Sequence, residues 1–217
     1  GGLYAGDRVD LDVTVATDAA FHLTTQAATV VHDGRGVGAM QRQTLRIGEG
    51  AFCAITTDPY VLFPGAALAL ETTAIVAENA TLCLVDGFAV HDPQVSGRAF
   101  AEFANRLTVM RPDGRLLLKD FGRAEGRDLR SGTLDVMAAA ANVLLIAPAT
   151  GWPATETLVR AADSCGCLAG ASEAPNCAGL VMRMLAPDGG ALARGIEAAF
   201  HGAARAALGA ELARRRK

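Results

Sequence analysis

Glu49-Gly-Ala-Phe-Cys-Ala-Ile-Thr-Thr-Asp58 is the stretch that decides the fold, because two other stretches of the chain are versions of it. Asp18-Ala-Ala-Phe-His-Leu-Thr-Thr-Gln26 precedes it and Glu78-Asn-Ala-Thr-Leu-Cys-Leu-Val-Asp86 follows it, so that the pattern recurs about every 30 residues. A fixed period of this length indicates stacked supersecondary units. Such a stack offers long faces to partner proteins, so the repeat favours a scaffold over an enzyme with one deep pocket.

Alternating apolar and polar residues predict strands around each copy of the repeat. Residues 8–16 and 41–47 alternate clearly, and each of these segments is followed by a turn and a second apolar segment. Arg111-Pro-Asp-Gly-Arg115 carries a strong hairpin-turn signal. We therefore predict a mainly β fold, a β-helix-like two-layered stack of antiparallel strand pairs. The other predicted strands are 21–31, 52–57, 68–77, 81–85, 103–110 and 116–121.

The last third of the chain adds a few helices to this stack. Residues 133–147 are apolar enough for one long strand or two short ones, and residues 178–185 predict another strand. Residues 154–164 have modest helix character. Asp188 is expected to cap a second helix, and no linker divides the chain, so residues 1–217 are expected to form a single domain. One face of that helix is apolar and consists of Leu192, Ile196, Ala199, Phe200 and Ala203.

Composition narrows the range of partners. The net charge of −3 predicts no strong attraction to nucleic acid or to an anionic membrane. The sequence contains no apolar run of about 18 residues, so no transmembrane helix is expected. The 5 cysteines are an odd number without a disulfide-like spacing, which predicts free thiols and a cytoplasmic location.

Two polar segments stand out as candidate sites. Gly1-Gly-Leu-Tyr-Ala-Gly-Asp7 is glycine-rich but does not match a nucleotide-binding fingerprint, so a turn capped by Asp7 is the simpler interpretation. Leu23-Thr-Thr-Gln-Ala-Ala-Thr29 is unusually polar for a strand. If the strand is regular, Thr25 and Thr29 lie on one side of it. The hydroxyls would then line a polar passage or bond neighbouring units, or the threonines simply favour a strand.

Metal-binding side chains are scattered along the chain. The period makes Asp58 the counterpart of Asp86, and His91 follows soon after Asp86. Stacked carboxylates with a histidine could pass a divalent ion, although turn residues facing water are the simpler interpretation. The segment 165–167, Cys-Gly-Cys, with Cys177 is a second possible site for a soft metal, but it lacks the paired spacing of structural zinc.

The sequence gives little support to catalysis. It has no Gly-x-Ser-x-Gly nucleophile elbow, and its serines have no nearby histidine. Two alternatives to a scaffold for metal delivery remain open. One is a β-solenoid enzyme that acts on carbohydrate through paired carboxylates such as Asp58 and Asp86, although aromatic residues make up only 5% of the chain. The other is a purely structural interaction module.

Several segments together resemble the urease accessory protein D family, also called UreD or UreH. The resemblance covers the chain from end to end. It rests on the two polar segments above, on Leu62-Phe-Pro-Gly65, on Gly179-Leu-Val-Met-Arg183 and on the basic terminus Arg215-Arg-Lys217, with His91-Asp-Pro-Gln-Val-Ser-Gly-Arg98 similar to a subset of the family. The positions that match the family motifs are Gly1, Gly2, Gly6, Asp7, Thr24, Thr25, Gln26 and Thr29.

The resemblance implies a non-enzymatic chaperone of urease maturation. A member of this family joins the urease apoprotein to UreF and to the GTPase UreG, and nickel passes through an internal tunnel toward the urease active site. The resemblance also implies that strands which precede the first glycine motif in the family are missing here. We expect no tightly bound cofactor, only transient nickel(II), and we take Asp58, Asp86 and His91 as candidates for its path.

Overall fold

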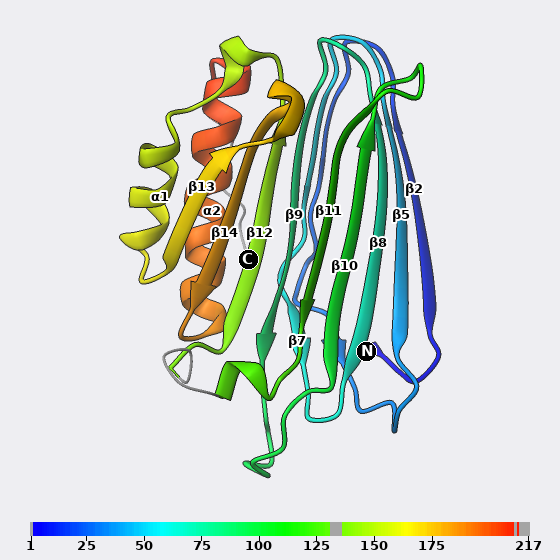
Figure 1. Cartoon of the computed structure of the whole chain (residues 1–217), viewed down its shortest axis with the longest axis vertical. Helices are drawn as coiled ribbons and strands as arrows, with labels where there is room; N and C mark the ends of the chain where they lie inside the picture. The colour runs from blue at the N-terminus through cyan, green and yellow to red at the C-terminus, as the bar shows by residue number, and fades with distance from the viewer. Residues whose placement is uncertain (1, 131–135, 211, 213–217) are drawn as a thin grey trace.

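Two β-sheets lie face to face in the computed structural model, and helices cover the outer side of one of them (Figure 1). The structure describes residues 2–130, 136–210 and 212. Gly1 of the glycine motif, the start of the strand predicted at 133–147 and the basic terminus 215–217 therefore lie outside the described residues. The mainly β, two-layered fold predicted from the repeat is confirmed.

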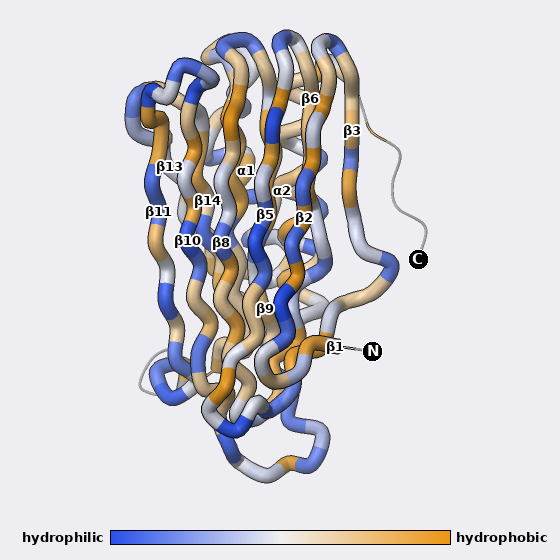
Figure 2. Tube along the Cα trace, turned by 90° about the vertical axis from the view of Figure 1, so that its right-hand side faces the viewer, coloured by the Kyte–Doolittle hydropathy of each residue, from blue (hydrophilic) through white to orange (hydrophobic). Residues whose placement is uncertain are grey.

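The small sheet has the strand order β11-β10-β8-β5-β2. Its first four strands in chain order pair parallel, and the last pairs antiparallel with β10. Polar and apolar residues alternate along these strands, because one face packs on the other sheet and one meets solvent (Figure 2). The strands are β2 (Arg8–Val15), β5 (Ala39–Ile47), β8 (Ala67–Val76), β10 (Glu102–Met110) and β11 (Leu116–Ala124).

The large sheet is centred on β9, which pairs with β12 on one side. On its other side β9 pairs with β6 along its first half and with β7 along its second half. From there β6 leads to β3, and β7 leads to β4 and β1. The strands are β1 (Gly2–Leu3), β3 (Ala20–Leu23), β4 (Val30–Val31), β6 (Phe52–Thr56), β7 (Tyr60–Leu62), β9 (Thr81–Val90), β12 (Ala139–Ile146), β13 (Leu168–Glu173) and β14 (Gly179–Ala186).

The repeat is a coil of a β-solenoid. The chain runs up one sheet, turns and comes down the other, so the two strands of a unit are antiparallel in direction but belong to opposite sheets (Figure 1). Hydrogen bonds join each strand to its counterpart one repeat later, as Phe52 to Thr81 in the parallel pair β6–β9. The hairpin predicted at 111–115 departs from this pattern, because β10 and β11 pair directly with each other.

The strand predicted at 21–31 is wrong in its middle. β3 ends at Leu23 and β4 begins at Val30, and residues 24–29 are irregular. The next coil breaks at the corresponding place, between Thr56 and Tyr60. Polar residues and Pro59 interrupt these two coils, whereas β9 of the third coil runs straight through. The sequence pattern also missed β13, whose small residues alternate weakly.

Two helices pack on the outer face of the large sheet, α1 (Thr155–Asp163) and α2 (Gly189–Leu208). The Asp188 side chain accepts a hydrogen bond from the Ala191 amide and caps α2, as predicted. The predicted apolar face of α2 is buried, and Leu192 is fully enclosed. No helix within the described ranges combines the length and the apolar character that crossing a membrane requires. Short 3₁₀ turns lie at Asp128–Arg130, Ala149–Gly151 and Pro175–Cys177.

The space between the sheets holds two separate apolar clusters. One contains Leu45, Ile55 and Val109, and the other contains Leu62, Leu70 and Phe88. A third cluster joins the large sheet to the helices. Both inter-sheet clusters use the inward faces of the same strands, one cluster toward each end. The inward residues between them are polar, and they separate the two clusters. This separation defines the candidate site.

Candidate functional site

A layer of polar side chains crosses the sandwich between the two inter-sheet clusters. In the large sheet, strand register aligns Asp86 with Asn142 and Asn142 with Arg183. These three residues alternate with others that face the helices, so they point toward the small sheet. The small sheet contributes residues of its inner face to the layer, namely Gln41, Gln43, Thr72, Asn105 and Asp120.

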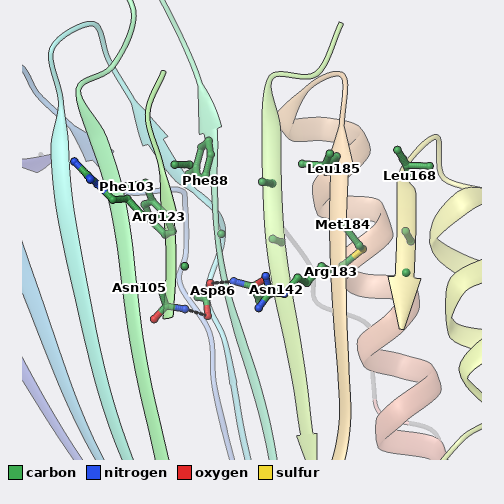
Figure 3. Close-up of a pocket in the computed structure, with 17 residues that line it drawn as sticks. Asp86, Phe88, Phe103, Asn105, Arg123, Asn142, Leu168, Arg183, Met184 and Leu185 are labelled. Atoms are coloured by element: carbon green, nitrogen blue, oxygen red, sulfur yellow. Dashed lines mark hydrogen bonds between the residues drawn. The ribbon is translucent and has the colours of Figure 1, made fainter. Parts of the chain in front are cut away.

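Asp86 is held from two sides by carboxamides. Asn105 Nδ2 donates to its Oδ2 at 2.6 Å, and Asn142 Nδ2 donates to its Oδ1 at 2.8 Å (Figure 3). Asn105 comes from the small sheet and is only 4% exposed. Asn142 comes from the strand next to Asp86. The carboxylate is therefore fixed at the interface of the sheets, and it accepts charge-assisted hydrogen bonds from both of them.

Asp86 faces a cavity of about 500 Å³ between the sheets. Its lining comes from β9, β12, β13 and β14 of the large sheet and from β10 and β11 of the small one (Figure 3). Phe88, Phe103 and Leu185 supply apolar walls. Enclosure in this cavity raises the pKa of Asp86 to about 6, although the hydrogen bonds from Asn142 and Asn105 act in the opposite direction. The group is thus an anion at neutral pH and loses its charge in mild acid.

The polar layer continues beyond Asp86 toward the first coils. The Tyr60 hydroxyl donates to Oε1 of Gln41 and links the sheets a second time. Burial, with the negative charge of Asp86, raises the pKa of Tyr60 to about 12, so it remains a neutral donor. Gln43 is 6% exposed, and its Oε1 is a buried acceptor without a protein partner. Buried acceptors without a partner are rare in folded proteins.

The potential metal ligands in the layer are mainly oxygen atoms. The Asp86 carboxylate and the carboxamide oxygens of Asn105 and Asn142 are hard ligands. Among the described residues, no group of three or more His, Cys, Asp or Glu side chains is close enough to hold a metal ion. The layer therefore presents one carboxylate and neutral carboxamide oxygens to any ion that enters it.

Asp58 does not share this cavity. Register pairs Thr56 with Val85 and Tyr60 with Phe88, so three residues of the second coil oppose two of the third. Asp58 lies in this bulge and is 7% exposed. It lines a separate cavity of about 390 Å³ beside the start of α2, on the helix side of the large sheet. The structure therefore does not bring Asp58 and Asp86 together, and the bulge shifts the repeat alignment by one residue.

His91 lies beyond the end of β9, roughly 17 Å along the strand from Asp86. Its ring contacts Phe63, with ring centroids 5.6 Å apart, in a ladder that continues through His32 to Tyr4. His91 is exposed and lies away from the polar layer. The nickel-path role predicted for Asp58, Asp86 and His91 stays a prediction.

The soft-metal site predicted for three cysteines is not assembled. Cys167 is buried beside α2, where its Sγ lies 3.5 Å from the Ala191 carbonyl oxygen. β13 separates Cys165 and Cys167 from Cys177, which is exposed at the next turn. All five cysteines are free thiols, as predicted.

The family-motif residues shape turns and join coils. Gly2 packs so closely on the next coil that a Cβ would lie 2.6 Å from the Val30 carbonyl oxygen. Gly6 has φ of 75°, and Asp7 Oδ2 accepts from the Tyr4 amide at 2.8 Å, so this segment is the capped turn that the simpler interpretation predicted.

The threonines bond the coil that follows them. Thr24 Oγ1 donates to the Thr56 carbonyl at 3.1 Å, and Thr25 Oγ1 accepts from the Asp58 amide at 2.9 Å. The Thr29 carbonyl accepts from the Val61 amide at 2.9 Å, whereas Gln26 is exposed. These contacts match the interpretation in which the segment bonds neighbouring units.

Sequence reasoning missed Asn105 and Asn142. Each asparagine interrupts the apolar side of its strand, between Phe103 and Leu107 in β10 and between Ala140 and Leu144 in β12. A polar residue at an inward position is unusual, because burial without a partner is costly. That signal was available in the sequence. The packing that brings Asn105 of β10 and Asn142 of β12 to Asp86 was not.

The fold and the site define a β-solenoid sandwich that carries a polar layer between its two sheets. Comparison with known proteins places the whole length of the chain in one family. The chain belongs to the UreD urease accessory protein family, whose model matches residues 1–217. It is 68% identical to "Urease accessory protein UreD 3" of Bradyrhizobium sp. (strain ORS 278), across all of this chain and 77% of that protein.

Further relatives carry the same description. The chain is 63% identical to "Urease accessory protein UreD 1" of Bradyrhizobium sp. (strain BTAi1 / ATCC BAA-1182), over 100% of this chain and 77% of that protein. It is 40% identical to "Urease accessory protein UreD 1" of Methylorubrum extorquens (strain PA1), over 100% of this chain and 75% of that protein. Family membership gives the protein an accessory role in urease maturation.

Proposed function

We propose that this protein carries nickel(II) toward the urease active site through the polar layer between its sheets, without itself catalysing a reaction. In this proposal it works in the cytoplasm, in a complex with the urease apoprotein, UreF and the GTPase UreG. The observation that carries the proposal is Asp86, a carboxylate held by two carboxamides in a cavity between the sheets. Nickel is cargo here, and no cofactor is tightly bound.

The ligand chemistry suits transport. Nickel(II) prefers imidazole and other nitrogen ligands to carboxylate and carbonyl oxygens. An oxygen site therefore holds nickel loosely, and a loose site releases the ion to the next one. The negative charge of Asp86 at neutral pH attracts the cation, while the neutral amides of Asn105 and Asn142 add no further charge. The partner GTPase would supply direction by hydrolysing GTP.

The surface suits a scaffold. The small sheet presents a broad outer face on which opposite charges alternate, as in the row Asp10, Arg42 and Glu71. Side chains on this face are held in register by the coils, so they form a rigid surface for a partner protein. The carbohydrate-enzyme alternative needs two carboxylates on either side of one bond. It loses support because Asp58 and Asp86 line different cavities.

Urease activation in cells tests the proposal. The full-length protein with Asp86→Ala is expected to yield urease with much less nickel and activity than wild type. Glu156→Ala is the matched control, because Glu156 is an exposed carboxylate on α1, away from the cavity and from the outer face of the small sheet. Co-purification with UreF, UreG and urease must stay unchanged in both variants. Full nickel loading with Asp86→Ala would exclude Asp86 from the path.

A second variant tests the route without removing a charge. Gly122 lines the cavity, and a Cβ at this position would meet no atom within 4 Å. Gly122→Leu therefore fills the cavity without forcing the backbone to move. If nickel passes here, this variant activates urease poorly although it folds and binds its partners. Normal activation with Gly122→Leu would place the nickel path elsewhere.

A further inference from the structure

The cavity around Asp86 opens at one side of the sandwich, where both sheets end. β11 is the edge strand of the small sheet and β13 is the edge strand of the large one. Each contributes a glycine to the cavity lining, Gly122 and Gly170, and a Cβ at either position would meet no atom within 4 Å. These two positions leave an opening between the edges, which we call the mouth.

An ion pair lies across this mouth. Arg183 of β14 is in register with Asn142 on one neighbouring strand, β12, and with Gly170 on the other neighbouring strand, the edge strand β13. Its Nη2 lies 2.8 Å from Oδ1 of Asp120, which belongs to β11. The Arg183 side chain is 61% exposed and that of Asp120 is 23% exposed. The pair thus connects the open edges of the two sheets, between solvent and Asp86.

We propose that the Arg183–Asp120 ion pair is a latch across the mouth, and that Arg183 controls how fast a divalent cation reaches Asp86. This inference rests on the proposed function. The guanidinium is a cation between solvent and the Asp86 carboxylate, so it repels an incoming ion of the same sign. An ion pair this exposed is weak and opens readily. When Arg183 swings away, its guanidinium no longer lies between solvent and Asp86, and the cation can enter.

The test measures nickel uptake by the purified full-length protein. Ni²⁺ is mixed with protein in a stopped-flow instrument in the presence of a chromogenic chelator, which gives the uptake rate and the equilibrium affinity. Arg183→Met keeps the length of the side chain and removes its charge and its partner. We expect uptake to become about fivefold faster, the upper end of the scale for an exposed ion pair.

Asp120→Asn separates a latch from a simple charge effect. The substitution leaves Arg183 charged but releases it from its partner, so a latch predicts faster uptake. Charge alone predicts slower uptake, because a negative group near the path is lost. Slower uptake with Asp120→Asn would overturn the latch. Arg115→Met is the matched control, because the exposed pair of Arg115 with Glu78, at 3.0 Å, lies in the β10–β11 turn region away from the cavity.

The same experiment distinguishes this inference from the function on which it rests. If Asp86→Ala takes up Ni²⁺ as wild type does, the proposed path through Asp86 fails and the latch fails with it. If Asp86→Ala loses uptake while Arg183→Met matches wild type, only the latch is overturned. Thermal melts of each variant confirm folding, which the exposure of Arg183 favours.

Discussion

Asn105 and Asp86 join the two sheets through one hydrogen bond, 2.6 Å long, although they belong to different coils. Asn105 lies on the inner face of β10 and Asp86 on the inner face of β9. The bond is charge-assisted when Asp86 is ionised, so it stabilises the anion more than the neutral acid. The ionisation of Asp86 therefore depends on how the two sheets pack against each other.

Replacing Asn105 should therefore change how easily Asp86 ionises. Asn105→Leu has nearly the same size but cannot donate, so we expect the pKa of Asp86 to rise above its present value of about 6. Carboxyl NMR of Asp86 as a function of pH measures the change. Thr108→Val on the outer side of the same strand is the control. An unchanged or lower pKa in Asn105→Leu would contradict the role assigned to this bond.

Stability should depend on pH through Asp86. Its pKa is raised from 3.8 to about 6 in the folded state, so between these values the folded protein holds a proton that the unfolded chain has released. The free energy of unfolding contributed by this group therefore falls as pH rises from about 4 to about 6 and then levels off. The loss is about 2–3 kcal/mol.

Asp86→Asn should remove this pH dependence, because asparagine does not titrate. The neighbouring carboxamides can turn to bond it, since each carries both a donor and an acceptor. Urea denaturation of both proteins between pH 4 and pH 8 measures the difference. The prediction is wrong if wild type and Asp86→Asn show the same change with pH over this range.

Thr25 should contribute to stability through the coil that follows it. Its Oγ1 accepts a hydrogen bond from the Asp58 amide, and Thr25→Val removes this bond at a cost of about 0.5–1.5 kcal/mol. Denaturation midpoints give the value. Thr14→Val, at an exposed position of β2, should change stability by less than about 0.5 kcal/mol. Equal stability of the two variants would mean that the hydroxyl of Thr25 serves another purpose.

Adding a methyl group should lower the stability of the protein strongly at one glycine and hardly at all at another. At Gly179, φ is 150° and a Cβ would lie 1.8 Å from the Leu145 carbonyl oxygen, so Gly179→Ala should destabilise by about 3 kcal/mol or more. At Gly170 the space is open, and Gly170→Ala should cost less than about 0.5 kcal/mol. Thermal unfolding compares them directly. A mild effect at Gly179 would show that β12 and β14 can separate without loss.

Much of the fold was readable from the chain because the repeat is local. The copies around Ala51 and Ala80 pair in the structure through β6 and β9, one repeat apart. The alternation in residues 41–47, the turn at 111–115 and the cap at Asp188 all follow from chemistry within a few residues. Asp86 was identified as a candidate because it ends a copy of the repeat.

The partners of Asp86 could be decided only by the tertiary structure. Asn105 and Asn142 are 19 and 56 residues away in sequence, and they meet Asp86 because one sheet packs on the other and β12 joins β9. The bulge at Asp58 depends in the same way on how two coils fit together. The sequence by itself determined most of the strands and their period, since these depend on neighbouring residues. The site required the packing of distant strands, because a buried carboxylate is stabilised only by the groups that the fold brings to it.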